Sequence, residues 1–102
     1  MAISKKDARP LCSDREWELV VESWNPELGE LPADRLRQNI QRARTQRDKF
    51  RDLARQQAGE ARGKRNPRST RPAQGNQNTK RKVELFDEAL ERFQARLAEV
   101  EA

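Results

Sequence analysis

Apolar residues recur along the chain at helical spacing and predict three helices. In the first, Trp17, Val20, Val21 and Trp24 stand at positions i, i+3, i+4 and i+7, which places them on one helical face. Ser13 precedes this stripe and Glu16 follows three residues later, which is the pattern of a capping box. Because a residue before proline avoids helical backbone angles, Asn25-Pro26 should end the element. A helix is therefore predicted over about residues 13–24.

Two longer apolar stripes follow, each with alternating spacings of four and three. The second helix, about 32–58, begins at Pro32, a residue suited to a first helical turn, and its stripe consists of Leu36, Ile40, Ala43, Phe50, Ala54 and Gln57, with Arg47 in the one gap. The third helix, about 79–101, carries Val83, Phe86, Leu90, Phe93, Leu97 and Val100. Such spacing is typical of a coiled-coil seam.

The two long stripes match each other in antiparallel order if the numbers of facing residues add to 140. Phe50 then faces Leu90. Ala54 faces Phe86, so in this layer a small residue meets a large one. On one flank, at a sum of 138, the register predicts ion pairs Arg37–Glu101 and Arg51–Asp87. The predicted fold class is all-α: a short N-terminal helix plus a long, coiled-coil-like antiparallel helical hairpin. The same stripes could pair between two chains, so a homodimer is the alternative.

Two segments lack apolar periodicity. Residues 1–12 are expected to form a mobile N-terminal arm, outside a single helical domain of residues 13–102. Residues 59–78 contain three Gly, two Pro and no large apolar residue, so they should form a flexible loop. The short first helix is expected to pack across the open end of the hairpin, because its two tryptophans need cover.

Charge is segregated along the chain, although the total is only +5. Residues 1–34 carry four basic and eight acidic side chains, and residues 83–102 carry two basic and six acidic ones. Between them, residues 35–54 carry seven basic and two acidic side chains, and residues 55–82 carry nine basic side chains against Glu60 alone. The middle of the chain is therefore a cation between two anionic ends, which suggests an anionic partner.

The residue types present argue against most chemistry. The chain has no His and only one cysteine, Cys12, so neither an intrachain disulfide nor a His-based catalytic or metal site is expected. The acidic run Glu84, Asp87, Glu88 and Glu91 is typical of a solvated helix face. We expect no enzyme activity, no cofactor, no metal and no small-molecule substrate. No apolar run is long enough to span a bilayer and no secretory signal is evident, so a soluble, cytoplasmic protein is expected.

The basic loop and its edges form the predicted site. These cations can follow a phosphate backbone, and Arg-rich segments of this kind often order on RNA: Arg62, Lys64, Arg65, Arg68, Arg71, Lys80, Arg81 and Lys82. A heptad-spaced set on the solvent side of the second helix, Arg35, Arg42 and Lys49, could extend this footprint. The leading hypothesis is a binding protein for RNA or DNA. The loop lacks the aromatic residue that stacks on a single strand, and the alternative is a charged, solubilising linker.

The tryptophan face of the first helix offers a second candidate surface. Packing into the core is the default interpretation of Trp17, Val21 and Trp24, but an exposed aromatic patch would be a protein interface. The rival function is accordingly a small adaptor or regulator, antitoxin-like or an assembly factor, that binds a protein partner. It would use this face or the acidic third helix. The Arg- and Ala-rich composition is common in short bacterial proteins and implies no function.

Overall fold

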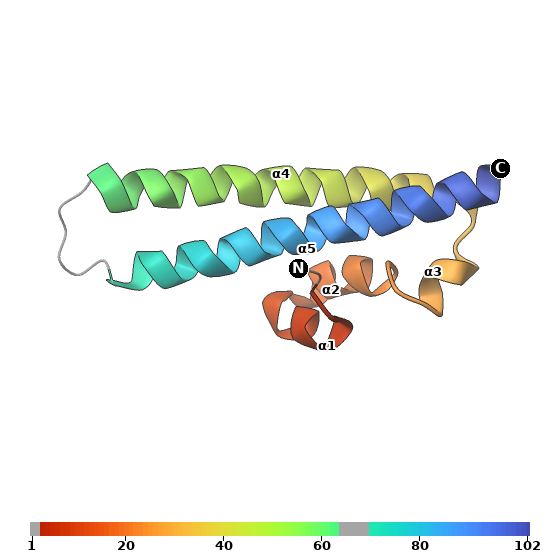
Figure 1. The fold of residues 1–102 in the computed structure, drawn as a ribbon, viewed down its shortest axis with the longest axis horizontal. Helices are drawn as coiled ribbons and strands as arrows, with labels where there is room; N and C mark the ends of the chain where they lie inside the picture. Colours follow the sequence, from red (N-terminus) through yellow and green to blue (C-terminus); the bar gives the residue numbers. More distant parts are fainter. Residues whose placement is uncertain (1–2, 64–69) are drawn as a thin grey trace.

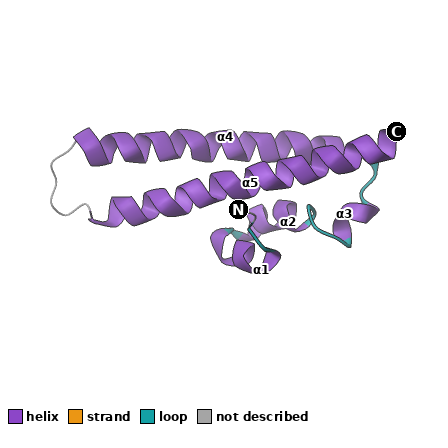
Figure 2. Cartoon of the chain, in the orientation of Figure 1, coloured by secondary structure: helices purple, strands orange, loops and turns teal. Residues whose placement is uncertain are grey.

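The computed structural model describes the backbone of residues 3–63 and 70–102 and the side chains of residues 3–57 and 77–102. All regular structure in these ranges is helical, without a strand (Figure 2). The elements in chain order are α1 (Lys5–Ala8), the 3-10 helix η1 (Arg9–Leu11), α2 (Asp14–Val21), α3 (Glu27–Glu30), α4 (Ala33–Gly63) and α5 (Thr70–Glu101). None of the described helices is both long and apolar enough to cross a bilayer.

Helices α4 and α5 lie side by side in opposite directions and dominate the molecule (Figure 1). Most of the predicted stripe residues are buried between them: Leu36, Ile40, Ala43 and Phe50 on α4, and Phe86, Leu90 and Phe93 on α5. The radius of gyration is 15.7 Å, against about 13 Å for a compact domain of 100 residues. The predicted pair of long helices is therefore confirmed, as an elongated unit with a thin core.

Both long helices extend further toward the basic segment than predicted. Helix α4 continues to Gly63 and α5 already begins at Thr70, whereas a loop was expected over 59–78. Pro72 did not prevent this, because it falls in the first turn of α5, where a backbone N–H has no intrahelical acceptor. Residues 64–69 of the predicted loop lie outside the described residues.

The contacts between the two long helices agree with the predicted register at the end of α5 and differ from it by about one turn around Phe50. Phe50 stacks on Phe86 instead of Leu90, with ring centroids 5.8 Å apart and planes 13° from parallel. Asp87 accepts a hydrogen bond from Arg47 at 3.2 Å instead of from Arg51, whereas the predicted ion pair Arg37–Glu101 is present. Alternating spacings of three and four keep apolar residues opposed after a one-turn slip. Contact between two aromatic rings favours the observed register over the predicted one.

The N-terminal segment packs along the side of α5 (Figure 1). It covers a second α5 face, spaced 3-4-3-4, that comprises Lys82, Leu85, Ala89, Arg92 and Arg96. Leu85 and Ala89 are fully buried there although they lie outside the predicted seam. The basic members reach back to the segment: Lys82 pairs with Glu16 at 3.1 Å, and Arg92 and Arg96 donate to the carbonyl oxygens of Ser23 and Gly29. This packing replaces the predicted position across the open end of the hairpin.

The first residues of the described chain are packed, which corrects the prediction of a mobile arm over 1–12. Ser4 caps α1 by accepting from the Asp7 amide, and Ile3 and Ala8 are buried in the core. The Ile3 amide also donates to Glu88 Oε1 of α5 at 2.8 Å. Two apolar anchors in so short a segment produce no periodicity, so the sequence pattern could not reveal them.

Local signals place α2 and the start of α4 correctly. The Ser13–Glu16 capping box is present, with both reciprocal hydrogen bonds formed. Helix α2 ends at Val21, three residues before the predicted end, and the Ser23 hydroxyl donates to the Val20 carbonyl at 2.7 Å. The Asn25–Pro26 peptide bond is cis. Helix α4 begins one residue after Pro32, as the sequence predicted to within a residue.

Candidate nucleic-acid interface

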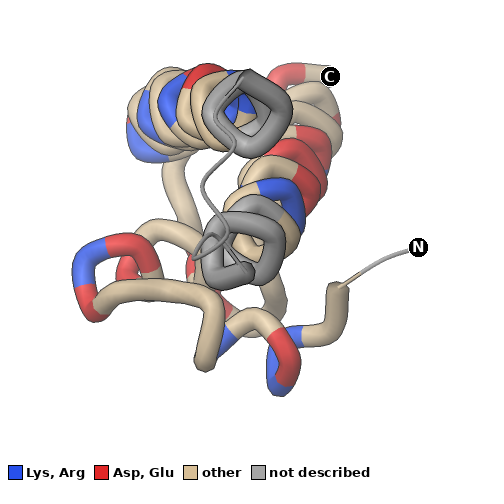
Figure 3. The backbone as a smooth tube through the Cα atoms, turned by 90° about the vertical axis from the view of Figure 1, so that its left-hand side faces the viewer, with Lys and Arg blue, Asp and Glu red and all other residues tan. Residues whose placement is uncertain are grey.

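Charge divides between the two long helices as well as along the chain. In Figure 3, Lys and Arg predominate on α4, whereas Asp and Glu predominate in the C-terminal half of α5. Near the chain termini the two sets pair across the helices, as in Arg37–Glu101 and Arg47–Asp87. The hydrogen bond that Arg47 donates to the Asp87 carboxylate, and then the one to Asp48, raises the pKa of the Arg47 guanidinium. In this half of the hairpin the paired cations Arg37 and Arg47 stabilise the fold, whereas Arg42 and Arg44 make no ion pair within the described chain.

The opposite half is called the distal end (residues 51–82), and its described side chains, those of residues 51–57 and 77–82, form no ion pair between α4 and α5. It contains a groove of about 420 Å³ between α4 and α5, with Ala54 and Val83 as its apolar floor and Arg51, Arg55, Lys80 and Glu84 around them. Within the described part of the chain, Arg51 and Lys80 make no ion pair. Arg55 approaches Asp52 only at 3.9 Å, and both side chains are more than 70% exposed. Three cations therefore share one groove with a single carboxylate.

The predicted basic-loop residues fall into three groups. Lys64, Arg65 and Arg68 lie outside the described residues, and only the helical backbone is described for Arg62 and Arg71. Lys80 and Arg81 are exposed on α5, next to the groove. Lys82 is half-buried and pairs with Glu16, and its Nζ lies 4.7 Å from the Phe50 ring centroid. Its charge is therefore already paired within the fold.

The predicted stripe Arg35, Arg42 and Lys49 does not form one solvent-facing surface. Arg35 pairs with Glu22 of α2 at 3.3 Å, and the same carboxylate oxygen accepts from the buried Asn39 amide at 2.9 Å. Arg42 lines a hollow of about 360 Å³ between α2 and α4. Lys49 lies 5.4 Å from the Phe50 ring centroid. The sequence could not show that α2 would lie against this side of α4.

The tryptophan face is half-buried and rich in cation contacts. Trp17 and Trp24 have ring centroids 6.3 Å apart and both pack against the core, while Val21 is also half-buried. The guanidinium carbon of Arg92 lies 4.4 Å from the Trp24 centroid, and that of Arg9 lies 5.5 Å from the Trp17 centroid. The default interpretation of core packing is thus supported for these rings, with part of Trp17 left accessible.

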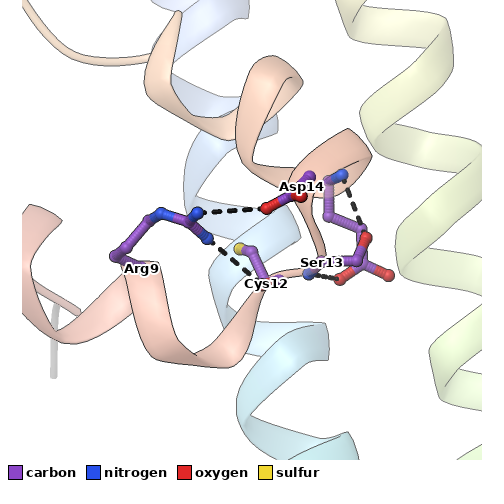
Figure 4. A network of polar contacts seen from close by, with 5 residues as sticks. Arg9, Cys12, Ser13 and Asp14 are labelled. Carbon is purple, nitrogen blue, oxygen red and sulfur yellow. Dashed lines mark hydrogen bonds and ion pairs between the residues drawn. The ribbon is translucent and has the colours of Figure 1, made fainter.

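Figure 4 shows the polar network that holds η1 against the start of α2. Arg9 donates to Asp14 at 3.1 Å and to the Cys12 carbonyl, and the Ser13 amide donates to Glu16. Burial, followed by the nearby Glu16 carboxylate, raises the pKa of the Cys12 thiol from 9.0 to about 11. The thiol is therefore protonated at neutral pH and is a weak nucleophile.

Among residues 3–57 and 77–102, no group of three or more His, Cys, Asp or Glu side chains could hold a metal ion. The sequence pattern did not indicate Arg51 and Arg55 as site residues, and the predicted register paired Arg51 with Asp87. The sequence did contain one signal for these site residues. Lys80 and Arg81, near the predicted start of the third helix, are basic and therefore cannot form ion pairs with the cations of α4.

Comparison of the chain with protein-family models, with curated proteins and with solved structures gives no match.

Proposed function

We propose that this chain is a non-enzymatic binding protein whose distal end engages nucleic acid, RNA or DNA. The observation that carries the proposal is the change in pairing along the hairpin. Arg37 and Arg47 meet carboxylates across the helix pair, whereas Arg51, Arg55 and Lys80 surround one groove with only Glu84 among them. Clustered like charges repel one another, and a bound polyanion relieves that repulsion while releasing its own counterions.

The adjoining sequence strengthens the same interpretation. Residues 55–82 carry nine basic side chains and one acidic side chain, so the groove lies beside the most basic part of the chain. We propose that the two long helices form a coiled-coil-like hairpin and that the cations around the groove lie along the phosphate backbone. The uniform charge and the absence of a described base-reading element favour sequence-tolerant binding.

A matched pair of variants tests the proposal. The groove variant combines Arg51→Gln, Arg55→Gln and Lys80→Gln, and the control variant combines Arg15→Gln, Arg42→Gln and Arg44→Gln. Both remove three positive charges from residues without a strong ion pair, but only the first changes the distal end. Fluorescence anisotropy with labelled RNA and DNA oligonucleotides should show that the groove variant binds about ten-fold more weakly at moderate salt.

The control variant should retain most of the wild-type affinity. Equal loss in the two variants would mean that only net charge matters and that the distal end is not a site. Absence of binding by the wild-type chain would overturn the proposal altogether. Circular dichroism on both variants checks that the helices remain intact.

A further inference from the structure

A hollow lined mainly by cations lies over the accessible part of Trp17. Lys5, Lys6, Arg9 and Pro10 line it together with the indole, and its volume is about 590 Å³. The side chains of Lys5 and Lys6 point outward because the buried Ile3 and Ala8 fix α1 against the core. An aromatic ring beside several cations is the combination that proteins use to hold single-stranded nucleic acid.

A second hollow connects this position to the distal end. It has a volume of about 470 Å³, shares Pro10 with the first hollow and reaches Leu53, Asn78 and Lys82 of the hairpin. Leu53 is 36% exposed, one of the large apolar side chains that the fold leaves open. Leu53, Asn78 and Lys82 belong to the distal end, so this hollow lies between the distal end and the first hollow.

None of the carboxylates that flank Trp17 in sequence lines either hollow, and Glu18, which makes no ion pair within the described chain, is exposed outside them. Asp14 pairs with Arg9 at 3.1 Å, and Glu16 pairs with Lys82 at 3.1 Å. Within the described chain, Lys5 and Lys6 make no ion pair, so their charges remain available to phosphates. The face presented along the two hollows is therefore apolar and cationic.

We propose that the two hollows form a track for single-stranded nucleic acid, which runs from the distal end to Trp17. One base stacks on the accessible part of the indole or on the Arg9 guanidinium above it, and the neighbouring phosphates lie against Lys5 and Lys6. This inference rests on the proposed function and supplies the aromatic contact that the basic segment lacks. Because a duplex keeps its bases stacked inside, the track selects single strands.

The two tryptophans make a direct test feasible, because they are the only ones in the chain. Trp24→Phe leaves Trp17 as the sole indole, and Trp17→Phe leaves Trp24, which Arg92 already covers. Titration of the Trp24→Phe protein with a single-stranded oligonucleotide should quench its fluorescence, and a duplex of the same length should quench it much less. The Trp17→Phe protein should respond weakly to both.

Binding affinity provides a second measurement, for which the substituted residues lie outside the buried core. Lys5→Gln with Lys6→Gln should weaken single-strand binding about five-fold and leave duplex binding nearly unchanged, whereas Arg15→Gln with Arg44→Gln should alter neither. If the wild-type chain binds with the expected salt dependence but Trp17 emission stays constant, the track is wrong and the distal-end proposal stands. Equal quenching by single strands and duplexes also overturns the track. If no oligonucleotide binds, the proposed function fails as well.

Discussion

Arg92 of α5 holds Ser23, a fully buried residue after the end of α2, through both its carbonyl and its hydroxyl oxygen. Nε lies 3.0 Å from the carbonyl oxygen and 3.2 Å from the hydroxyl oxygen, and Nη2 lies 3.0 Å from the hydroxyl oxygen. The same guanidinium lies over Trp24. Burial lowers the pKa of Arg92, so its charge is partly desolvated to make these contacts. This residue joins the N-terminal segment to the hairpin.

Arg92→Leu should therefore lower the free energy of unfolding by about 2–3 kcal/mol, because it leaves the buried Ser23 carbonyl without a donor. Urea denaturation measures the change, and Arg81→Leu, at an exposed position of the same helix, should shift stability by less than about 0.5 kcal/mol. Equal effects of the two substitutions would show that Arg92 does not hold the segment in solution.

The burial of the second face of α5 predicts an order of stability effects that is opposite to the order expected from the sequence pattern alone. Leu85, outside the predicted seam, is fully buried, whereas Val100, within it, is 41% exposed. Leu85→Ala should cost about 2–4 kcal/mol of unfolding free energy, and Val100→Ala less than about 1 kcal/mol. Thermal and urea unfolding of both variants test the order. A larger cost at Val100 would contradict the docking of the N-terminal segment.

The register of the hairpin can be measured by double-mutant cycles. Arg47→Gln and Asp87→Asn should show a coupling of about 0.5–1 kcal/mol, since their side chains are in contact and Arg47 is half-buried. Arg51→Gln with Asp87→Asn should show coupling near zero. Coupling at Arg51 in place of Arg47 would restore the register in which facing residue numbers add to 140.

Cys12 should react slowly with thiol reagents. Because the pKa of Cys12 is raised to about 11, the thiol stays protonated at pH 8. The reactive thiolate should be roughly a hundred-fold scarcer than for a thiol with a pKa of 9.0. Alkylation by iodoacetamide at pH 8 should be slower in the folded protein than in urea by about that factor, and should accelerate as pH rises toward 11. Equal rates in the folded and unfolded protein would show that the thiol is not shielded.

Local and periodic signals explain which parts of the fold could be predicted. The Ser13–Glu16 capping box and the Leu36–Phe50 stripe depend on residues a few positions apart, so the sequence contains their full information. The packing of Ile3 and Ala8, and the burial of Leu85, depend on contacts between distant segments. The shift of about one turn around Phe50 could not be predicted either, because apolar residues face one another in both registers, and side-chain contacts such as Phe50–Phe86 and Arg47–Asp87 distinguish them.

The charge of the sequence indicated the region of the candidate site, but the fold determines which of its cations pair with carboxylates. Lys82 and Arg35 were expected to contact phosphates, but Glu16 and Glu22 engage them. Arg51, expected to pair with Asp87, makes no ion pair with any residue that the structure describes and lines the groove beside Lys80. Net charge along the chain correctly indicated the basic region, whereas the cations that remain available could be identified only after the helices were paired.

The salt dependence of nucleic-acid binding tests the central claim most directly. The logarithm of the binding constant should fall linearly with the logarithm of salt concentration, and neutralising Arg51, Arg55 and Lys80 should reduce the slope by about 2, at about 0.7 per phosphate contact on a single strand. Neutralising Arg15, Arg42 and Arg44 should leave the slope unchanged. A wild-type slope near zero, or the same slope in the wild-type chain and the groove variant, would contradict the assignment of the distal end as the nucleic-acid site.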